Sequence, residues 1–279
     1  MSSTYLDGIL AWHRARAAGD RRDLGGLRGL ALAYEVPTRP FERCLRTQTA
    51  VSPAPSGTTP AVIAEVKRRS PSKGDLAIDL DAAQVAIEYQ NGGASALSVL
   101  TDAPHFAGSP EDLTAARAAT TLPVLRKDFT VCEADICDAR LMNADAVLLI
   151  VAALSDDELA RFLALTRALA MGGLVEVHDV PEARRAVAAG AVIIGVNQRD
   201  LRTFEVDRAR AEIVAASLPA DVVKVAESGI RTRAEVVRLG EAGYDAVLVG
   251  ETLVRDPDRA GAVAALRGVE VPGLSGVRG

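Results

Sequence analysis

Residues 61–101 have the sequence AVIAEVKRRSPSKGDLAIDLDAAQVAIEYQNGGASALSVLT. The β-branched apolar run at 61–66 is followed by a polar loop, by a segment of helical period at 79–91 and by a second apolar run at 96–101. A helix that connects two neighbouring strands returns the chain so that both strands point the same way. This stretch therefore predicts one strand–helix–strand unit of a parallel sheet.

The same pattern recurs along the rest of the chain. Six further apolar runs lie at 122–127, 146–153, 174–178, 192–197, 222–228 and 246–251. The segments of helical period that follow the second and later runs lie at 109–120, 133–143, 155–170, 180–190, 207–218, 232–243 and 256–268. Ser109, Ser155 and Thr232 stand where helix N-cap residues are expected.

Eight such units predict a closed (βα)8 TIM barrel, of the α/β class, over residues 61–279. The structural alternative is an open doubly wound sheet, which usually carries a glycine-rich dinucleotide turn after its first strand. Here the first strand leads into KRRSPSKG, and the chain contains no GxGxxG. We therefore favour the barrel.

Residues 1–60 do not fit the repeat and are expected to form an N-terminal helical extension of the same domain. The segment LDGILAWHRARA at 6–17 looks helical, and VSPAPSGTTP at 51–60 is typical of a connector. We interpret the arginine-rich helix as a solvated surface rather than a binding surface. Packing across one end of the barrel is the alternative.

Composition and charge exclude several classes of protein. Of the 279 residues, 49% are hydrophobic and only 4% aromatic, which suits a parallel sheet surrounded by alanine-rich helices. The formal charge of −5 is spread along the chain, so neither nucleic acid nor an anionic membrane is an expected partner. With no signal peptide and no run of about 18 apolar residues, we expect a soluble cytoplasmic protein.

Neither the cysteines nor the histidines predict a metal site. The three cysteines, Cys44, Cys132 and Cys137, match no metal-ligand spacing and suit a compartment where thiols stay reduced. The histidines His13, His105 and His178 stand far apart, with no HxH or HExxH spacing. We therefore expect no histidine-built metal site, although an ion held by carboxylates stays open.

Ionisable and amide residues stand at the carboxyl ends of five predicted strands. In a barrel these positions point into the shared mouth where substrates bind. Alone, any one of them could be a buried Lys or Glu paired across the barrel interior. Because all fall at the same end, we predict a shared site. The residues are Glu65, Lys67, Lys127, Glu176, Asn197, Glu227 and Ser228.

The last two strands lead into small residues at turns, in the segments AESGI and VGET. In TIM barrels the loops after the seventh and eighth strands commonly bind phosphate, because free backbone N–H groups can approach the anion closely. Ser228, Gly229 and Gly250 are the candidates. We therefore expect a small phosphorylated substrate.

Taken together, the motifs IAEVKRRSPSKG, SVLTDAPHFAGSPEDL, PVLRKDF, ADAVLLIVAAL, LVEVHD, IIGVNQRDLRTFEVD, VAESGI and AVLVGETL resemble the indole-3-glycerol phosphate synthase family. The match runs in order from about residue 61 to 255 and touches all eight predicted strands. The resemblance implies a carboxy-lyase of tryptophan biosynthesis. Such an enzyme cyclises 1-(2-carboxyphenylamino)-1-deoxyribulose 5-phosphate with loss of carbon dioxide and water.

The resemblance also implies catalytic roles for named residues. Lys127 matches the general acid that protonates the substrate carbonyl, and Glu176 matches the acid/base residue of the dehydration. Glu65 matches a second essential carboxylate, and the division of roles between the two glutamates stays open. Lys67 matches the lysine that holds the anionic substrate. Asn197 and Glu227 would anchor the sugar hydroxyls or the lysines.

Further matches concern substrate binding. Ser228, Gly229, Gly250 and Glu251 match the phosphate loops, where Glu251 could serve only through its backbone N–H. Ser70 matches a position near the phosphate, and Arg199 one near the benzoate. Phe106 and Phe129 would form apolar walls that fold the aryl group onto the carbonyl. The loop SPSKG after the first strand is expected to be a mobile lid, with a plain polar turn as the alternative.

Two other functions stay open. An aldolase would use Lys67 or Lys127 as a Schiff base, but both lysines are expected beside carboxylates, which favour the charged amine. A barrel that has lost catalysis could serve as a scaffold, although no main position of the motif set is replaced. We expect no cofactor and a monomer or weak homo-oligomer.

Overall fold

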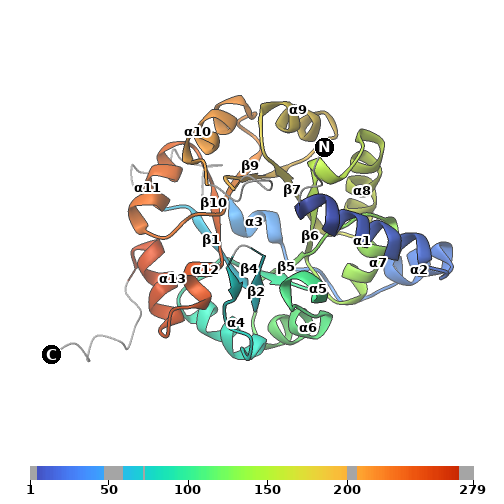
Figure 1. The fold of residues 1–279 in the computed structure, drawn as a ribbon, viewed down its shortest axis with the longest axis horizontal. Helices are drawn as coiled ribbons and strands as arrows, with labels where there is room; N and C mark the ends of the chain where they lie inside the picture. Colours follow the sequence, from blue (N-terminus) through green and yellow to red (C-terminus); the bar gives the residue numbers. More distant parts are fainter. Residues whose placement is uncertain (1–4, 47–58, 72, 200–205, 270–279) are drawn as a thin grey trace.

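The computed structural model describes residues 5–46, 59–71, 73–199 and 206–269. Eight parallel strands close into a barrel in the order β1-β10-β9-β8-β7-β6-β5-β4 (Figure 1), which confirms the predicted fold. Their bounds are β1 Ala61–Val66, β4 Ala96–Leu100, β5 Val124–Lys127, β6 Ala146–Ile150, β7 Gly172–Val177, β8 Ile193–Asn197, β9 Val223–Glu227 and β10 Ala246–Val249.

The helices that connect the strands surround the barrel (Figure 1). Ser109, Ser155 and Thr232 each accept a hydrogen bond from the backbone N–H three residues further on, as N-cap residues do. The helices are α4 Ala82–Asn91, α5 Ala103–Phe106, α6 Pro110–Ala119, α7 Glu133–Leu141, α8 Asp156–Ala168, α9 Val180–Ala188, α10 Arg208–Ser217, α11 Arg233–Glu241, α12 Glu251–Val254 and α13 Arg259–Arg267.

Three segments after strands differ from the expected pattern. The run at 146–153 leaves the sheet at Ile150, because Val151–Ala153 forms the 3₁₀ helix η1. The run at 246–251 ends at Val249, because Gly250 is the N-cap of α12. After β1, the strands β2 Arg69–Ser70 and β3 Gly74–Asp75 form a separate antiparallel ribbon. The loop expected to be a lid is thus partly a hairpin, and its Ser72 lies outside the described residues.

Alternation along each strand divides the apolar residues into two cores. One core fills the inside of the barrel and includes Ile63, Leu125 and Leu174. The other lies between the strands and the helices and includes their neighbours Val62 and Val124. A side chain's position in the strand therefore decides whether it faces the barrel axis or a helix.

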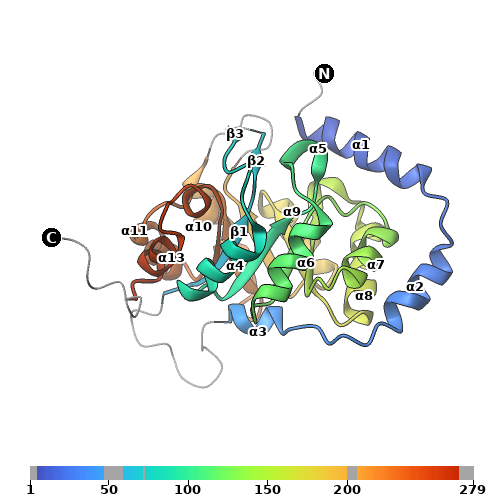
Figure 2. The same ribbon diagram turned by 90° about the horizontal axis from the view of Figure 1, so that it is seen from below.

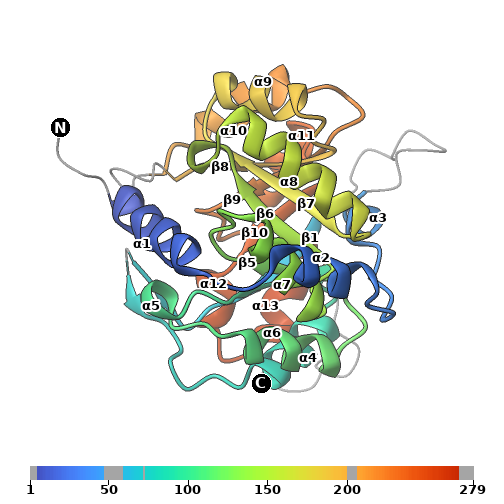
Figure 3. The ribbon, with the colours of Figure 1, turned by 90° about the vertical axis from the view of Figure 1, so that its right-hand side faces the viewer.

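The N-terminal segment covers both ends of the barrel. Helix α1 Tyr5–Gly19 lies at the end that carries α5, and α3 Phe41–Leu45 lies at the opposite end (Figures 2 and 3). Between them, α2 Leu24–Leu32 packs against α7. Phe41 and Leu45 are buried and belong to the core inside the barrel. Helix α3 therefore closes the end where the strands begin.

The expectation that the N-terminal helix is a solvated surface is wrong for one side of α1. Ile9 and His13 are buried, and Arg14 and Arg16 form ion pairs with Glu158 and Asp135 of the barrel helices. The alternative, packing across one barrel end, is what the structure has. Most of the connector expected at 51–60 lies outside the described residues. Among the described helices, none has the length and apolar character needed to cross a bilayer.

We predict that Phe41→Ala lowers the free energy of unfolding by about 3–5 kcal/mol, the usual cost of removing a buried phenylalanine side chain. The change would be measured from the urea midpoint at constant slope. Leu30→Ala on α2, where the side chain is 64% exposed, serves as the control and should change stability by less than about 0.5 kcal/mol. Equal effects of the two substitutions would contradict the assignment of α3 as the barrel's closing element.

Candidate active site

A cavity of about 320 Å³ opens at the carboxyl ends of the strands. Every residue that the sequence singled out lines it. These are Glu65, Lys67, Ser70, Phe106, Lys127, Phe129, Glu176, Asn197, Arg199, Glu227, Ser228, Gly229, Gly250 and Glu251. The structure thus brings together side chains that are spread over nearly the whole barrel sequence.

Strand alternation explains how the ionisable residues come to face one another. Glu65 follows the inward-facing Ile63 by two positions, and Lys127 follows Leu125 in the same way. Glu176 follows Leu174, and Glu227 follows Val225. Each of these four strands therefore ends its apolar inner layers with one polar side chain at the mouth.

Lys127 is the central cation of this layer. Its Nζ lies 3.3 Å from Glu176 Oε2 and 3.6 Å from Glu227 Oε2. Burial alone would lower the pKa of Lys127, but the charges of Glu176, Glu227 and Glu65 outweigh it and hold that pKa above its ordinary value. The lysine therefore stays an ammonium ion at neutral pH.

Glu176 is surrounded by donors. Besides Lys127, Asn197 Nδ2 donates to its Oε1 at 3.1 Å, and His178 Nε2 lies 3.5 Å from the same oxygen. Burial would raise the pKa of Glu176, but the charges of Lys127 and His178 and the bond from Asn197 lower it below the ordinary range. This glutamate is ionised at neutral pH.

Glu227 is in the opposite state. Its Oε1 is buried and has no hydrogen-bond partner among the described residues. Burial raises the pKa of Glu227 to about 8 against the attraction of Lys127, and the charges of Glu176 and Glu65 act in the same direction as burial. Gly195 of β8 makes room for it, because a Cβ there would collide with Glu227 Oε1. The pKa values of the two carboxyl groups beside Lys127 are thus shifted in opposite directions.

Glu65 and Lys67 form a second polar pair at the mouth. Lys67 Nζ donates to Glu65 Oε1, and Ser98 Oγ donates to Glu65 Oε2 at 3.4 Å. Gly250 packs closely against this pair, since a Cβ there would collide with Glu65 Oε1. The pair therefore borders the loop after β10.

The loops after β9 and β10 provide backbone donors. Ser228 and Gly229 have φ of 68° and 75°, so the chain turns through the left-handed region just after Glu227. Gly250 precedes α12, whose first N–H groups have no partner within the helix. Arg231 and Arg255 also line the cavity and were not singled out from the sequence. They could have been found from the sequence, because each stands at most a few residues after the segments AESGI and VGET, which were assigned to the phosphate loops.

The apolar part of the cavity comes from two sources. Phe106 and Phe129 have ring centroids 6.3 Å apart. Tyr5, Leu6 and Ile9 of α1 also line the cavity. Sequence analysis missed these three because they precede the first strand by more than fifty residues and carry no local signal of a cavity.

Two histidines that stand far apart in the sequence come together beside the mouth. The ring centroids of His13 and His105 are 6.1 Å apart, and both rings face Asp102. Sequence spacing did not predict this cluster. The expectation of no histidine metal site assumed that histidines far apart in the sequence would also lie far apart in the fold. His178 lies elsewhere, beside Glu176 and Glu182.

Comparison with known proteins gives a consistent result. The model of a family described as indole-3-glycerol phosphate synthase matches residues 18–266. The indole-3-glycerol phosphate synthase of Mycobacteroides abscessus is 46% identical over 265 residues, which are 95% of this chain and 94% of that protein. That of Micrococcus luteus is 59% identical over 194 residues, 70% of this chain and 72% of that protein.

Among solved structures, thiamine phosphate pyrophosphorylase from Pyrococcus furiosus matches with a TM-score of 0.55 and 17% identity. The match covers 76% of this chain and 96% of that one. At this identity the likeness concerns the barrel fold alone.

We predict that Glu227→Gln flattens the pH dependence of stability. Native Glu227 binds its proton more tightly than the unfolded chain does, with a pKa raised from 4.5 to about 8. Its contribution to stability is therefore present below about pH 4.5 and lost as pH rises toward 8. Urea midpoints measured across this range should fall less in the variant than in the parent protein.

The control is Glu241→Gln on the exposed end of α11, which should leave the parent profile unchanged. Burial would lower the pKa of His178, but the bond with Glu182 and, in part, the charge of Glu227 raise it, so the comparison measures Glu227 together with its interaction with His178. Parallel profiles for the parent and Glu227→Gln would contradict a protonated Glu227.

Proposed function

The chain belongs to the indole-3-glycerol phosphate synthase family, and we propose that the charged layer at its barrel mouth performs the family's ring closure. The reaction converts 1-(2-carboxyphenylamino)-1-deoxyribulose 5-phosphate to indole-3-glycerol phosphate, with loss of carbon dioxide and water. The observation that supports this assignment most is the half-buried ammonium of Lys127 between Glu176 and Glu227, in a cavity that also offers backbone donors and two apolar rings.

The phosphate is proposed to bind at the loops after β9 and β10. Gly229 and Gly250 line the cavity there, and so do Arg231 and Arg255, whose positive charges would favour a phosphate. Glu251 contributes through its backbone N–H alone, because its carboxylate would repel the phosphate. Ser70, on the ribbon after β1, lies at the same cavity and is proposed to add a hydroxyl contact.

Lys127 is the proposed general acid of ring closure. The aryl carbon that carries the carboxyl group attacks the carbonyl carbon, and the carbonyl oxygen takes a proton from the ammonium group. The raised pKa of Lys127 keeps that proton available, and the positive charge stabilises the oxygen as its negative charge develops. Cleavage of the bond to the carboxyl group then returns an electron pair to the ring and releases carbon dioxide.

The dehydration is proposed to use the unequal states of the two neighbouring carboxyl groups. Glu176 is ionised and can accept the proton that the intermediate loses, while Asn197 and Lys127 hold it in place. Glu227 carries a proton at neutral pH and can donate a hydrogen bond to a substrate hydroxyl. The hydroxyl formed in ring closure takes a second proton from Lys127, which has been reprotonated from solvent, and leaves as water; the proton on Glu176 then returns to solvent. Lys67, paired with Glu65, is proposed to hold the substrate carboxylate until it departs.

Phe106 and Phe129 are proposed to press the aryl group onto the carbonyl by restricting the bound conformers. Arg199 lines the same cavity and is proposed to contact the benzoate. The ribbon after β1 is proposed to act as a lid. A charged Lys127 disfavours a Schiff-base aldolase, since a nucleophilic amine must be uncharged.

The substrate is a phosphorylated sugar derivative, and the finer assignments of partner and compartment are inferences. We infer a monomeric or weakly self-associating cytoplasmic enzyme that needs neither nucleic acid nor membrane. Its three cysteines are unpaired, which suits a reducing compartment. Every step of the reaction is redox-neutral and the acid and base are proposed to be Lys127 and Glu176, so turnover is expected without an organic cofactor or added metal.

Lys127→Met should lower kcat by about a hundredfold or more, because it keeps the side-chain length and removes the acid. Turnover would be followed by the fluorescence of the indole product, and substrate affinity by equilibrium binding. Lys224→Met is the matched control: Lys224 lies on the outer side of β9 and donates to the Ala215 carbonyl. Unchanged turnover in Lys127→Met would remove the acid assignment, and loss of binding alone would make Lys127 a binding residue.

His178 is proposed to be a positioning residue for Glu176. Its Nδ1 lies 3.0 Å from Glu182 Oε2, and its Nε2 points to Glu176 Oε1. Burial would lower the pKa of His178, but the bond with Glu182 and the charge of Glu176 raise it above the ordinary value. When His178 is protonated, its charge favours the ionised form of Glu176.

His178→Gln should shift the acid limb of the kcat profile toward higher pH, by up to about one unit, because Glu176 loses a neighbouring positive charge. KM should change little, since His178 does not line the cavity. The comparison is Glu182→Gln, which should shift the limb less because the imidazole remains. An acid limb that does not move would show that His178 has a structural role only.

A further inference from the structure

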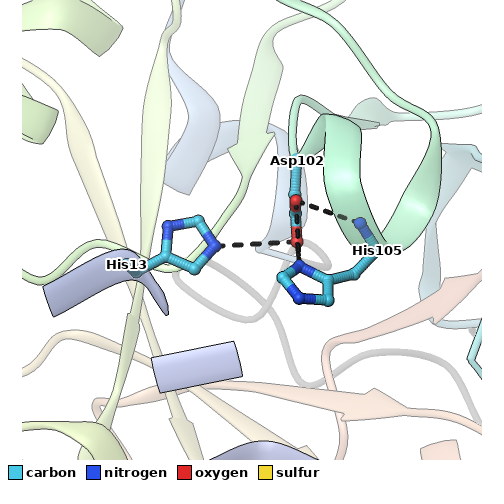
Figure 4. A group of neighbouring side chains, drawn as sticks. All are labelled: His13, Asp102 and His105. Carbon is cyan, nitrogen blue, oxygen red and sulfur yellow. Dashed lines mark hydrogen bonds and ion pairs between the residues drawn. The ribbon is translucent and has the colours of Figure 1, made fainter. Parts of the chain in front are cut away.

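His13, Asp102 and His105 form a cluster between the N-terminal helix and the barrel. His13 comes from α1, Asp102 follows β4 as the N-cap of α5, and His105 lies on α5 (Figure 4). We propose that these three side chains bind one divalent transition-metal ion, with Zn²⁺ as the best chemical match. The ion would clip α1 to the rim of the mouth.

The ligand atoms are already near the distances that a metal requires. His13 Nε2 lies 3.6 Å and His105 Nδ1 2.9 Å from the same oxygen, Asp102 Oδ2. One ligand atom from each residue lies within 4.8 Å of the others. Zinc bonds to nitrogen and oxygen are about 2.0–2.2 Å long in a tetrahedral site, which places ligand atoms roughly 3.3 Å apart. Movements of about an ångström or less would complete the site.

His13 is the observation that points to a ligand. Its side chain is only 3% exposed, yet neither ring nitrogen has a hydrogen-bond partner among the described residues. Buried polar groups in native proteins almost always have a partner. The ring is held by Trp12 and Phe129, whose centroids lie 4.8 and 5.1 Å away, and its Nε2 faces Asp102. A metal ion would supply the missing partner.

The charges around the cluster favour a cation. Asp102 is 2% exposed and faces the two histidines. A second carboxylate, Asp128, lies 4.0 Å from His13 Nε2 and is paired with Arg126. Asp102 is contacted by the backbone N–H and the ring Nδ1 of His105, and a buried carboxylate is stabilised further by a nearby positive charge. A divalent ion supplies it and also matches the donor set.

The donor set selects the class of metal. Two imidazole nitrogens and one carboxylate oxygen suit zinc, copper, nickel or cobalt rather than magnesium or calcium. Three protein ligands leave a fourth position for water. The His105 side chain is 19% exposed, so solvent can reach that side of the cluster. This proposal reverses the expectation drawn from sequence spacing.

The ion would fix the position of helix α1 at the barrel mouth and would not contact the reacting atoms. Tyr5, Leu6 and Ile9 of the same helix line the catalytic cavity, whereas His13 does not. Binding at His13 therefore holds α1 over the cavity through the helix itself. The ring closure needs no electrons from a metal, so the site is independent of the proposed function.

The test uses the full chain and its single tryptophan as the reporter. The Trp12 ring lies 4.8 Å from the His13 ring and 5.9 Å from the His105 ring, within range of quenching by a paramagnetic ion. Protein freed of metal by a chelator would be titrated with Co²⁺ by fluorescence and with Zn²⁺ by calorimetry at neutral pH. We expect one ion per chain, quenching by Co²⁺, and displacement of Co²⁺ by Zn²⁺.

Substitutions then locate the site. His105→Ala changes a partly exposed side chain, and His13→Phe keeps a ring in the aromatic contact, so both variants should fold, as checked by circular dichroism. Each should weaken Zn²⁺ binding at least about tenfold. Loss of a residue that only orients a metal ligand already costs about that much, and these substitutions remove a ligand itself. His178→Ala, which removes the histidine outside the cluster, should bind like the parent. Saturating Zn²⁺ should raise the Tm of the parent by about 5 °C or more and leave that of His13→Phe unchanged.

Three results would overturn the proposal. The first is the absence of saturable Zn²⁺ binding below roughly 100 µM, a Kd too weak to hold the helix. The second is equal binding by the parent, His13→Phe and His105→Ala. The third is loss of binding in His178→Ala alone, which would place the ion at Glu176 and Glu182. None of these results depends on turnover, so each leaves the proposed function untouched.

Discussion

The ammonium of Lys127 lies in the barrel mouth between the carboxyl groups of Glu176 and Glu227, and the chemistry of the site depends on that arrangement. Lys127 contacts both buried carboxyl groups, but their other neighbours differ. Glu176 also accepts a hydrogen bond from Asn197 and has His178 beside it, and its pKa is lowered. One oxygen of Glu227 has no hydrogen-bond partner within the described part of the chain, and burial raises the pKa of Glu227 to about 8. The mouth therefore holds an acid, a base and a hydrogen-bond donor from only two residue types.

Much of this arrangement could be predicted from the sequence. In a closed parallel barrel, side chains alternate between the inside and the helices, so a residue's position along its strand decides which side it faces. Once Ile63 and Leu125 are assigned to the inside, Glu65 and Lys127 must follow them to the mouth. The helix N-caps Ser109, Ser155 and Thr232 could also be predicted, because a capping residue is recognised from the few residues around it. What alternation cannot give is the opposite protonation of Glu176 and Glu227, which depends on neighbours contributed by other strands.

The parts that sequence analysis missed all involve contacts between distant segments. The apolar side of α1 carries no sign that it covers a cavity, and His13 meets Asp102 across nearly ninety residues. Helix α3 likewise closes the barrel through Phe41, a contact that no local pattern predicts. The N-terminal segment thus closes one end and covers the other. A cover that lies over the mouth provides a physical reason for tying α1 to the rim at His13.

The most direct measurement is a crystal structure with an unreactive substrate analogue in which the reacting carbonyl is reduced to a hydroxyl. We predict that this hydroxyl lies within about 3.2 Å of Lys127 Nζ, with the phosphate on the backbone N–H groups near Gly229 and Gly250. A hydroxyl bound away from Lys127, with the lysine still paired only to Glu176 and Glu227, would contradict the account.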